Sequence, residues 1–136
     1  RLSRCGPDAL KLEFAVDVHH DADHNHWTIA CERVTEASTC PWTLLSAGVD
    51  YEDYLAQYQV AAASGASGFV AGRAIWKECV TMNPAERANF LESTARPRLQ
   101  MLREITVRSA ARWTDYFRPE KAEENWYQAY PSLWSK

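Results

Sequence analysis

Apolar and polar positions alternate with a period of two between Leu10 and Val16. Successive side chains of a strand point to opposite faces, so Lys11 and Glu13 would share one face and the apolar side chains the other. Two environments fit this pattern. One is a half-exposed strand whose polar face meets water, and the other is a barrel strand whose polar face lines an active site.

Helical and extended patterns alternate along the next part of the chain. Apolar residues recur at helical spacing over 27–38 and 51–64, and the second segment starts after a capping residue, Asp50, and stops before Gly65. Short apolar runs over 42–45 and 68–71 predict buried strands.

The remainder of the chain predicts two helices and an aromatic tail. Asn83, Pro84 and Glu86 form a strong helix start, and we expect Pro97 to divide this helix from a second one. The apolar residues expected near one face of the second helix are Leu99, Leu102, Ile105, Ala110, Trp113 and Phe117. Residues 119–136 are rich in tryptophan and tyrosine and predict an ordered strap on the body.

Short strands that alternate with helices are typical of βαβ units and a parallel sheet. We therefore predict an α/β domain over 1–118, followed by the aromatic strap over 119–136. Only three strands are predicted, so helices on one side would leave the face of Lys11 and Glu13 uncovered. That face then meets water, a partner, or the interior of a barrel completed by other strands.

Composition narrows the function classes. The 136 residues carry a net charge of −3 and a pI near 5.8, which argues against nucleic-acid binding. The sequence contains no run of about 18 apolar residues, so we expect no membrane span. The four cysteines, Cys5, Cys31, Cys40 and Cys79, form no CxxC pair, and we predict reduced thiols in a cytoplasmic protein.

A histidine-rich segment, HHDADHNH, follows the first predicted strand. Its candidate metal ligands are His19, His20, Asp23, His24 and His26. Residues four apart converge on a metal only in a helix, whereas segments rich in aspartate and asparagine are usually loops. We predict a solvated loop and no metal; a substrate contact by one histidine and a zinc site are the alternatives.

Two loops that follow predicted strands have the features of anion sites. The first contains Ser46, Ala47 and Gly48, and the second contains Gly72 and Arg73. Glycine lets backbone N–H groups approach an anion closely, and arginine binds pairs of phosphate oxygens. Because both loops follow parallel strands, we expect them at the same edge of the sheet.

The stretches LKLEF, PWTLLSAGVD and GASGFVAGRAIWKE resemble, in order and spacing, the C-terminal part of class I tagatose-1,6-bisphosphate and sulfofructose-1-phosphate aldolases. The resemblance implies strands six to eight of a (β/α)₈ TIM barrel. It also implies Lys11 as the Schiff-base lysine, Glu13 as a second catalytic residue, and the two loops as the phosphate site, with no cofactor. Ala15 stands where the family usually has proline, and a glutamate that acts as general acid/base on an earlier strand has no counterpart here.

These features predict a class I aldolase, a carbon–carbon lyase that cleaves a ketose 1-phosphate to dihydroxyacetone phosphate and an aldehyde. An amine attacks a carbonyl only when neutral, and enclosure inside a barrel favours the neutral form of Lys11. Because the sequence starts at Arg1 and lacks five strands, we expect an N-terminal partner chain or segment and an oligomer. The alternatives are a non-catalytic sugar-phosphate-binding or assembly subunit and a metal-binding module.

Overall fold

The computed structural model describes residues 5–118 and 124–125. Its centre is a parallel sheet in the order β1–β2–β3, formed by β1 (Leu10–Leu12), β2 (Trp42–Leu45) and β3 (Gly68–Val70). The predicted mixed α/β class and small parallel sheet are confirmed. This arrangement is compatible with part of a TIM barrel.

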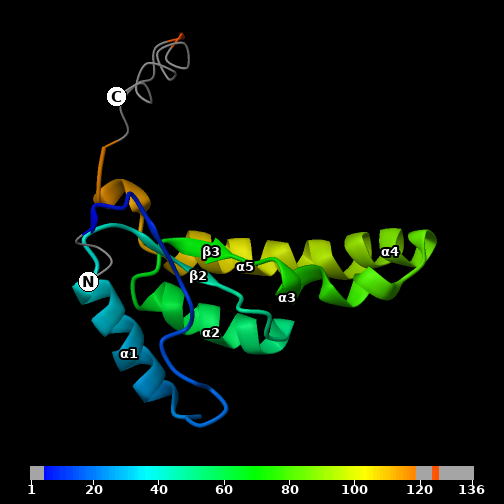
Figure 1. Ribbon diagram of the computed structural model, residues 1–136, viewed down its shortest axis with the longest axis horizontal. Helices are drawn as coiled ribbons and strands as arrows, with labels where there is room; N and C mark the ends of the chain where they lie inside the picture. Colours follow the sequence, from blue (N-terminus) through cyan, green and yellow to red (C-terminus); the bar gives the residue numbers. More distant parts are fainter. Residues whose placement is uncertain (1–4, 119–123, 126–136) are drawn as a thin grey trace.

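Helices cover one face of the sheet (Figure 1). They are α1 (His24–Ala37), α2 (Tyr51–Ala63) and α5 (Arg96–Ser109). The core between helices and sheet contains Cys31 from α1, Trp42 and Leu44 from β2, Tyr54, Tyr58, Ala61 and Ala62 from α2, and Leu102 and Ile105 from α5. The Tyr54 hydroxyl donates a hydrogen bond of 2.8 Å to the Leu44 carbonyl, which joins α2 to the central strand.

The helix boundaries follow from their caps. Helix α1 begins at His24, three residues before the expected start, because the Asp23 carboxylate accepts a hydrogen bond from the Asn25 N–H. Helix α2 follows Asp50 as predicted. Gly65 has φ +106° directly after the C-cap residue of α2, a left-handed conformation that glycine adopts readily.

A helical arm follows β3. It comprises α3 (Arg73–Trp76), the 3₁₀ segment η2 (Lys77–Thr81), α4 (Pro84–Phe90) and the π-helical segment η3 (Leu91–Ala95), which leads into α5. The predicted capping box of α4 is confirmed, since the Asn83 side chain accepts from the Glu86 N–H while Glu86 accepts from the Asn83 N–H. The arm projects from the body (Figure 1).

Pro97 marks the start of α5 as expected, but the prediction for the apolar face of this helix is wrong. The helical path continues from α4 through η3, and Pro97 lies in the first turn of α5, where the missing proline N–H costs little. Leu102 and Ile105 are buried, but Leu99, Trp113 and Phe117 are each more than 40% exposed. Helix α5 ends at Ser109, so the aromatic residues beyond it do not continue its buried face. Apart from 124 and 125, the strap predicted at 119–136 lies outside the described residues.

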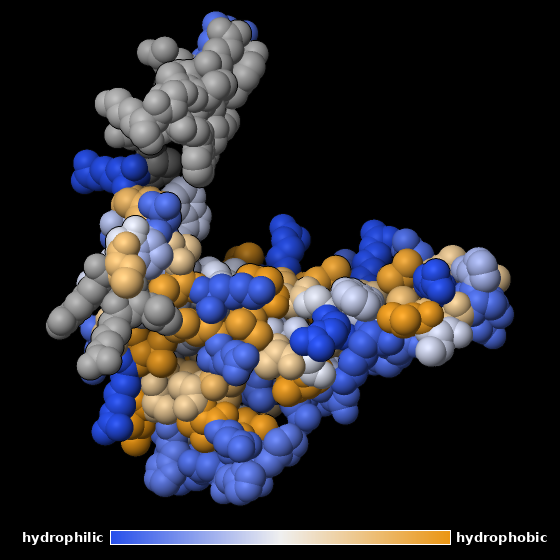
Figure 2. Space-filling view, in the orientation of Figure 1, coloured by the Kyte–Doolittle hydropathy of each residue, from blue (hydrophilic) through white to orange (hydrophobic). Residues whose placement is uncertain are grey.

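The surface mixes charged and apolar side chains. Figure 2 shows apolar side chains gathered over the body of the molecule, and both kinds along the arm. The exposed apolar residues include Ile29, Val70, Trp76, Val80 and Val107. Within the described residues, every helix is too short or too polar to cross a bilayer. Cys31, Cys40 and Cys79 are buried thiols outside any disulfide.

Candidate active site

The carboxyl ends of the three strands surround one open hollow of about 240 Å³. It is lined by Lys11, Leu45, Ser46, Ala47, Val70, Gly72, Arg73 and Trp76. Five of the seven residues predicted to form the site are therefore brought together: Lys11, Ser46, Ala47, Gly72 and Arg73. They come from three separate segments, and parallel pairing of the strands aligns those segments.

Lys11 lies on the face of the sheet that the helices leave open. In β1 the side chains of Leu10 and Leu12 are partly buried against the core, whereas Lys11 is exposed. The strand register puts Thr43 beside Lys11, and Gly68 beside Thr43. Thr43 and Gly68 continue this face of the sheet across β2 and β3.

The loop after β2 has an unusual backbone. Ser46 is 7% exposed, and its N–H donates to the Val70 carbonyl at 3.3 Å, which holds the loop against the end of β3. Ala47 and Gly48 follow with φ of +48° and +89°. Alanine rarely occupies the left-handed region, and such residues are concentrated at functional sites.

The Arg73 guanidinium packs against Gly48 of this loop. A Cβ atom on Gly48 would lie 3.1 Å from Arg73 Cζ, closer than an ordinary contact. Gly48 does not line the hollow, but it forms the surface on which the guanidinium rests. Glycine at this position therefore serves both the backbone conformation and the close approach of Arg73.

The hollow contains two positive side chains and no negative one among the residues that line it. Neither the Lys11 amine nor the Arg73 guanidinium makes a hydrogen bond or ion pair with any residue that the structure describes. Unpaired cations around one cavity favour an anionic ligand. The arrangement can therefore bind a phosphate or carboxylate next to a primary amine.

Glu13 and Trp76 differ from the expectations. Glu13 is exposed, one residue beyond the end of β1, and is not among the residues that line the hollow. Trp76, which the sequence did not single out, lies in its wall with 42% of its surface exposed. The available signal in the sequence was a large aromatic residue three positions after Arg73, a spacing that puts both side chains on one side of a helical turn.

The histidine-rich segment lies elsewhere and does not form a metal cluster. Over the described ranges, which include all four histidines, no group of three or more His, Cys, Asp or Glu side chains is suited to hold a metal ion. The His20 and His26 rings face Asp17 and Asp21, while the Asp23 carboxylate caps α1. Hydrogen bonds from His19 and His20 keep the pKa of Asp17 below its usual value.

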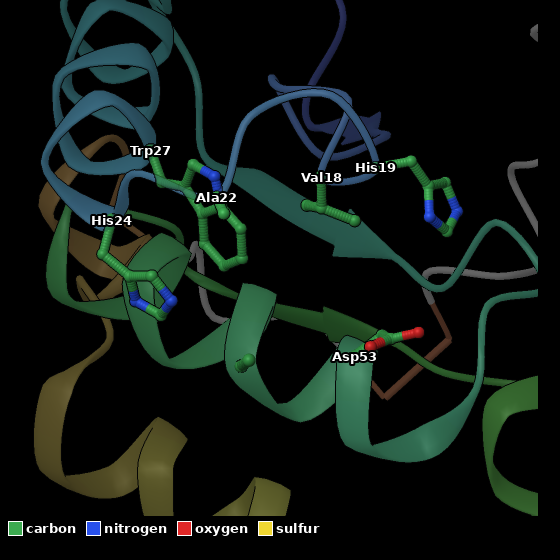
Figure 3. A pocket seen from close by; sticks show the side chains of 7 residues that line it. Val18, His19, Ala22, His24, Trp27 and Asp53 are labelled. Atoms are coloured by element: carbon green, nitrogen blue, oxygen red, sulfur yellow. The ribbon is translucent and has the colours of Figure 1, made fainter.

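A second hollow beside this segment is lined partly by histidine. It has a volume of about 190 Å³ and lies among the loop, α1 and α2 (Figure 3). His24 stacks on Trp27 at one end, whereas His19 and Asp53 lie at the other end. These imidazoles do not converge on one point. The loop predicted for this segment is wrong from His24 onwards, because His24 and His26 lie in the first turn of α1.

A sequence model of the DeoC/LacD family aldolases matches residues 2–78, more than half of the chain. The chain belongs to this family. The match includes all three strands and both loops of the hollow. The prediction of an aldolase, and thus of a carbon–carbon lyase, is confirmed at the level of the family. The narrower resemblance to tagatose and sulfofructose phosphate aldolases stays a prediction.

Proposed function

We propose that this DeoC/LacD family chain supplies the amine and the phosphate site of a class I aldolase that cleaves a ketose 1-phosphate. The observation that carries the proposal is the common hollow of Lys11 and Arg73, two cations without partners in the described chain. The Lys11 side chain can act as a nucleophile once its ammonium group has lost a proton, and the Arg73 guanidinium can hold a phosphate.

The proposed reaction begins with addition of the Lys11 amine to the substrate ketone. Loss of water gives an iminium ion, which accepts the electron pair when the C3–C4 bond breaks after loss of the C4 hydroxyl proton. The aldehyde leaves, and protonation and hydrolysis of the resulting enamine release dihydroxyacetone phosphate and regenerate Lys11. Phosphate binding by the Ser46 loop, Gly72 and Arg73 would fix the ketone near the amine and lower the barrier through orientation.

The base for the C4 hydroxyl would come from strands beyond the three described here. Glu13 lies outside the hollow wall, and no carboxylate among the described residues lines the hollow. The open face and the outer edges of β1 and β3 offer pairing sites for further strands. We propose that another chain or segment completes a (β/α)₈ barrel, in which this sheet forms strands six to eight.

The deciding experiment is reductive trapping on the native protein. Dihydroxyacetone phosphate and borohydride should leave one reduced adduct on this chain, which peptide mass spectrometry would locate at Lys11. Lys11→Met should abolish the adduct while the far-UV circular dichroism stays unchanged. Trapping that is equal in a chelator would agree with a metal-free mechanism. An adduct at another lysine, or none when phosphate binds, would overturn the Schiff-base assignment.

A second candidate is a sugar-phosphate-binding or assembly subunit without turnover. The absence of a carboxylate from the described wall of the hollow favours it. This candidate predicts that phosphate esters bind equally well to Lys11→Met, and that a ketose 1-phosphate is never cleaved, even with a completing chain present.

A further inference from the structure

Lys77 lies outside the hollow but joins the two loops that form it. It is the first residue of η2, just after α3. Its Nζ donates to the Gly48 carbonyl at 3.2 Å and forms an ion pair with the Asp50 carboxylate. Both acceptors belong to the loop between β2 and α2. Lys77 therefore connects the segment after β3 to the loop after β2.

Asp50, the ion-pair partner of Lys77, does not cap its own helix with its side chain. Asp50 is the N-cap residue of α2, where an aspartate normally accepts a hydrogen bond from the first turn of the helix. Its side chain makes no such bond and faces Lys77 instead. The hydrogen bond from Lys77 and its positive charge keep the pKa of Asp50 below its usual value.

The Gly48 carbonyl links this contact to Arg73. Gly48 presents its carbonyl to Lys77, and its α-carbon lies against the Arg73 guanidinium. Gly48 has φ of +89° and, because it lacks a side chain, can adopt many backbone conformations. A hydrogen bond to its carbonyl therefore restricts a peptide group that could otherwise rotate. A turn of this peptide would move the surface on which Arg73 rests.

We propose that Lys77 is a positioning residue, which holds the Gly48 loop and Arg73 in the geometry that binds the substrate phosphate. This inference rests on the proposed function and deepens it. Lys77 acts through Gly48 and Arg73, because it does not line the hollow and its charge is paired with Asp50.

The test compares a phosphorylated ketone with an uncharged one. For Lys77→Met, the concentration of dihydroxyacetone phosphate that gives half-maximal borohydride trapping should rise about fivefold, near the upper end for loss of a partly exposed ion pair. The half-saturating concentration of dihydroxyacetone should stay unchanged, because it has no phosphate for the loops to hold. Equal losses for both ketones would indicate general unfolding and would overturn the proposal.

Asp50→Asn distinguishes positioning from direct binding. If Lys77 positions the loop, loss of the ion pair weakens trapping by dihydroxyacetone phosphate in the same direction as Lys77→Met. If Lys77 binds the phosphate itself, the substitution releases its charge and strengthens trapping, which would contradict the proposal. The matched controls are Arg96→Met and Glu92→Gln, which break an exposed ion pair on the helical arm and should change neither ketone.

Inorganic phosphate separates this inference from the aldolase proposal. It should slow hydrogen exchange of the amides in 46–50, and Lys77→Met should raise the required phosphate concentration about fivefold. That result without any borohydride adduct would support the positioning role and overturn the Schiff-base function. A wild-type chain that neither traps ketones nor responds to phosphate would overturn both.

Discussion

The two faces of the sheet differ in the burial and the polarity of their side chains. On the covered face, Trp42 and Leu44 are almost completely buried and belong to the core that the sheet shares with helices α1, α2 and α5. On the open face, Lys11 is exposed and Thr43 and Leu45 are only half-buried. Packing determines the residues of the first face, whereas the second keeps polar and cationic side chains that contribute little to the core.

The difference shows how one short strand serves stability and chemistry together. Because side chains alternate, each residue of β2 belongs wholly to one face. Loss of a covered side chain should therefore reduce the free energy of unfolding, while loss of an open one should change ligand binding. Substitutions on the two faces test this division.

Neighbouring leucines on opposite faces provide the sharpest test. Leu44→Ala should lower the free energy of unfolding by about 4 kcal/mol, because it leaves a cavity in a fully buried site. Leu45→Ala should cost less than about 1 kcal/mol, since this side chain faces the hollow. Urea unfolding followed by tryptophan fluorescence gives both values, and equal losses would refute the division between the faces.

Alkaline pH should lower the free energy of unfolding through ionisation of Cys31, which lies in the core on the covered side of the sheet. Burial raises the pKa of this thiol from 9.0 to about 11, so the neutral form stabilises the fold. This contribution is complete below pH 9 and is lost as the pH rises to about 11; it amounts to roughly 2–3 kcal/mol at about 1.4 kcal/mol per pKa unit. Unfolding of Cys31→Ala should show a correspondingly shallower fall over this range. Identical pH profiles for the two proteins would contradict the prediction.

Two glycines test the open side. Gly48→Ala should cost about 1–2 kcal/mol, because alanine is strained at a φ of +89°. It should also weaken phosphate binding, since the new Cβ would displace the Arg73 guanidinium. Gly68→Ala is the control: its φ is not positive, its Cβ would meet only Thr43 Cγ2 at 3.7 Å, and it is not among the residues that line the hollow. Calorimetric titration with phosphate and urea unfolding should separate the two variants.

Helix α4 contributes no residue to the hollow and none to the buried core, so it adds a third reference. Helix α4 has no buried residue, so its start depends on the Asn83 capping box. Asn83→Ala should cost about 1 kcal/mol and speed hydrogen exchange at the first amides of α4. Phosphate binding should stay unchanged. Asn89→Ala, in the same helix but away from its cap, should show little effect.

Local chemistry made much of the fold readable from the sequence. The alternation at Leu10–Leu12, the apolar run of β2, and the caps at Asn83 and Gly65 depend on neighbours within a few residues. The meeting of the two loops at one hollow was predictable for another reason, because parallel strands bring their carboxyl ends to one edge. The start of α1 was missed by three residues, since the cap lay inside a segment rich in aspartate and histidine.

The packing of the elements established which residues meet. The strands, the loops and the lysine that faces away from the core could be predicted from the sequence, because periodicity and turn chemistry are local. The sequence could not reveal that Asp50 forgoes its capping bond for Lys77, 27 positions away, or that Trp76 rather than Glu13 enters the hollow wall. Such contacts depend on the distances between packed elements, and no local pattern contains those distances.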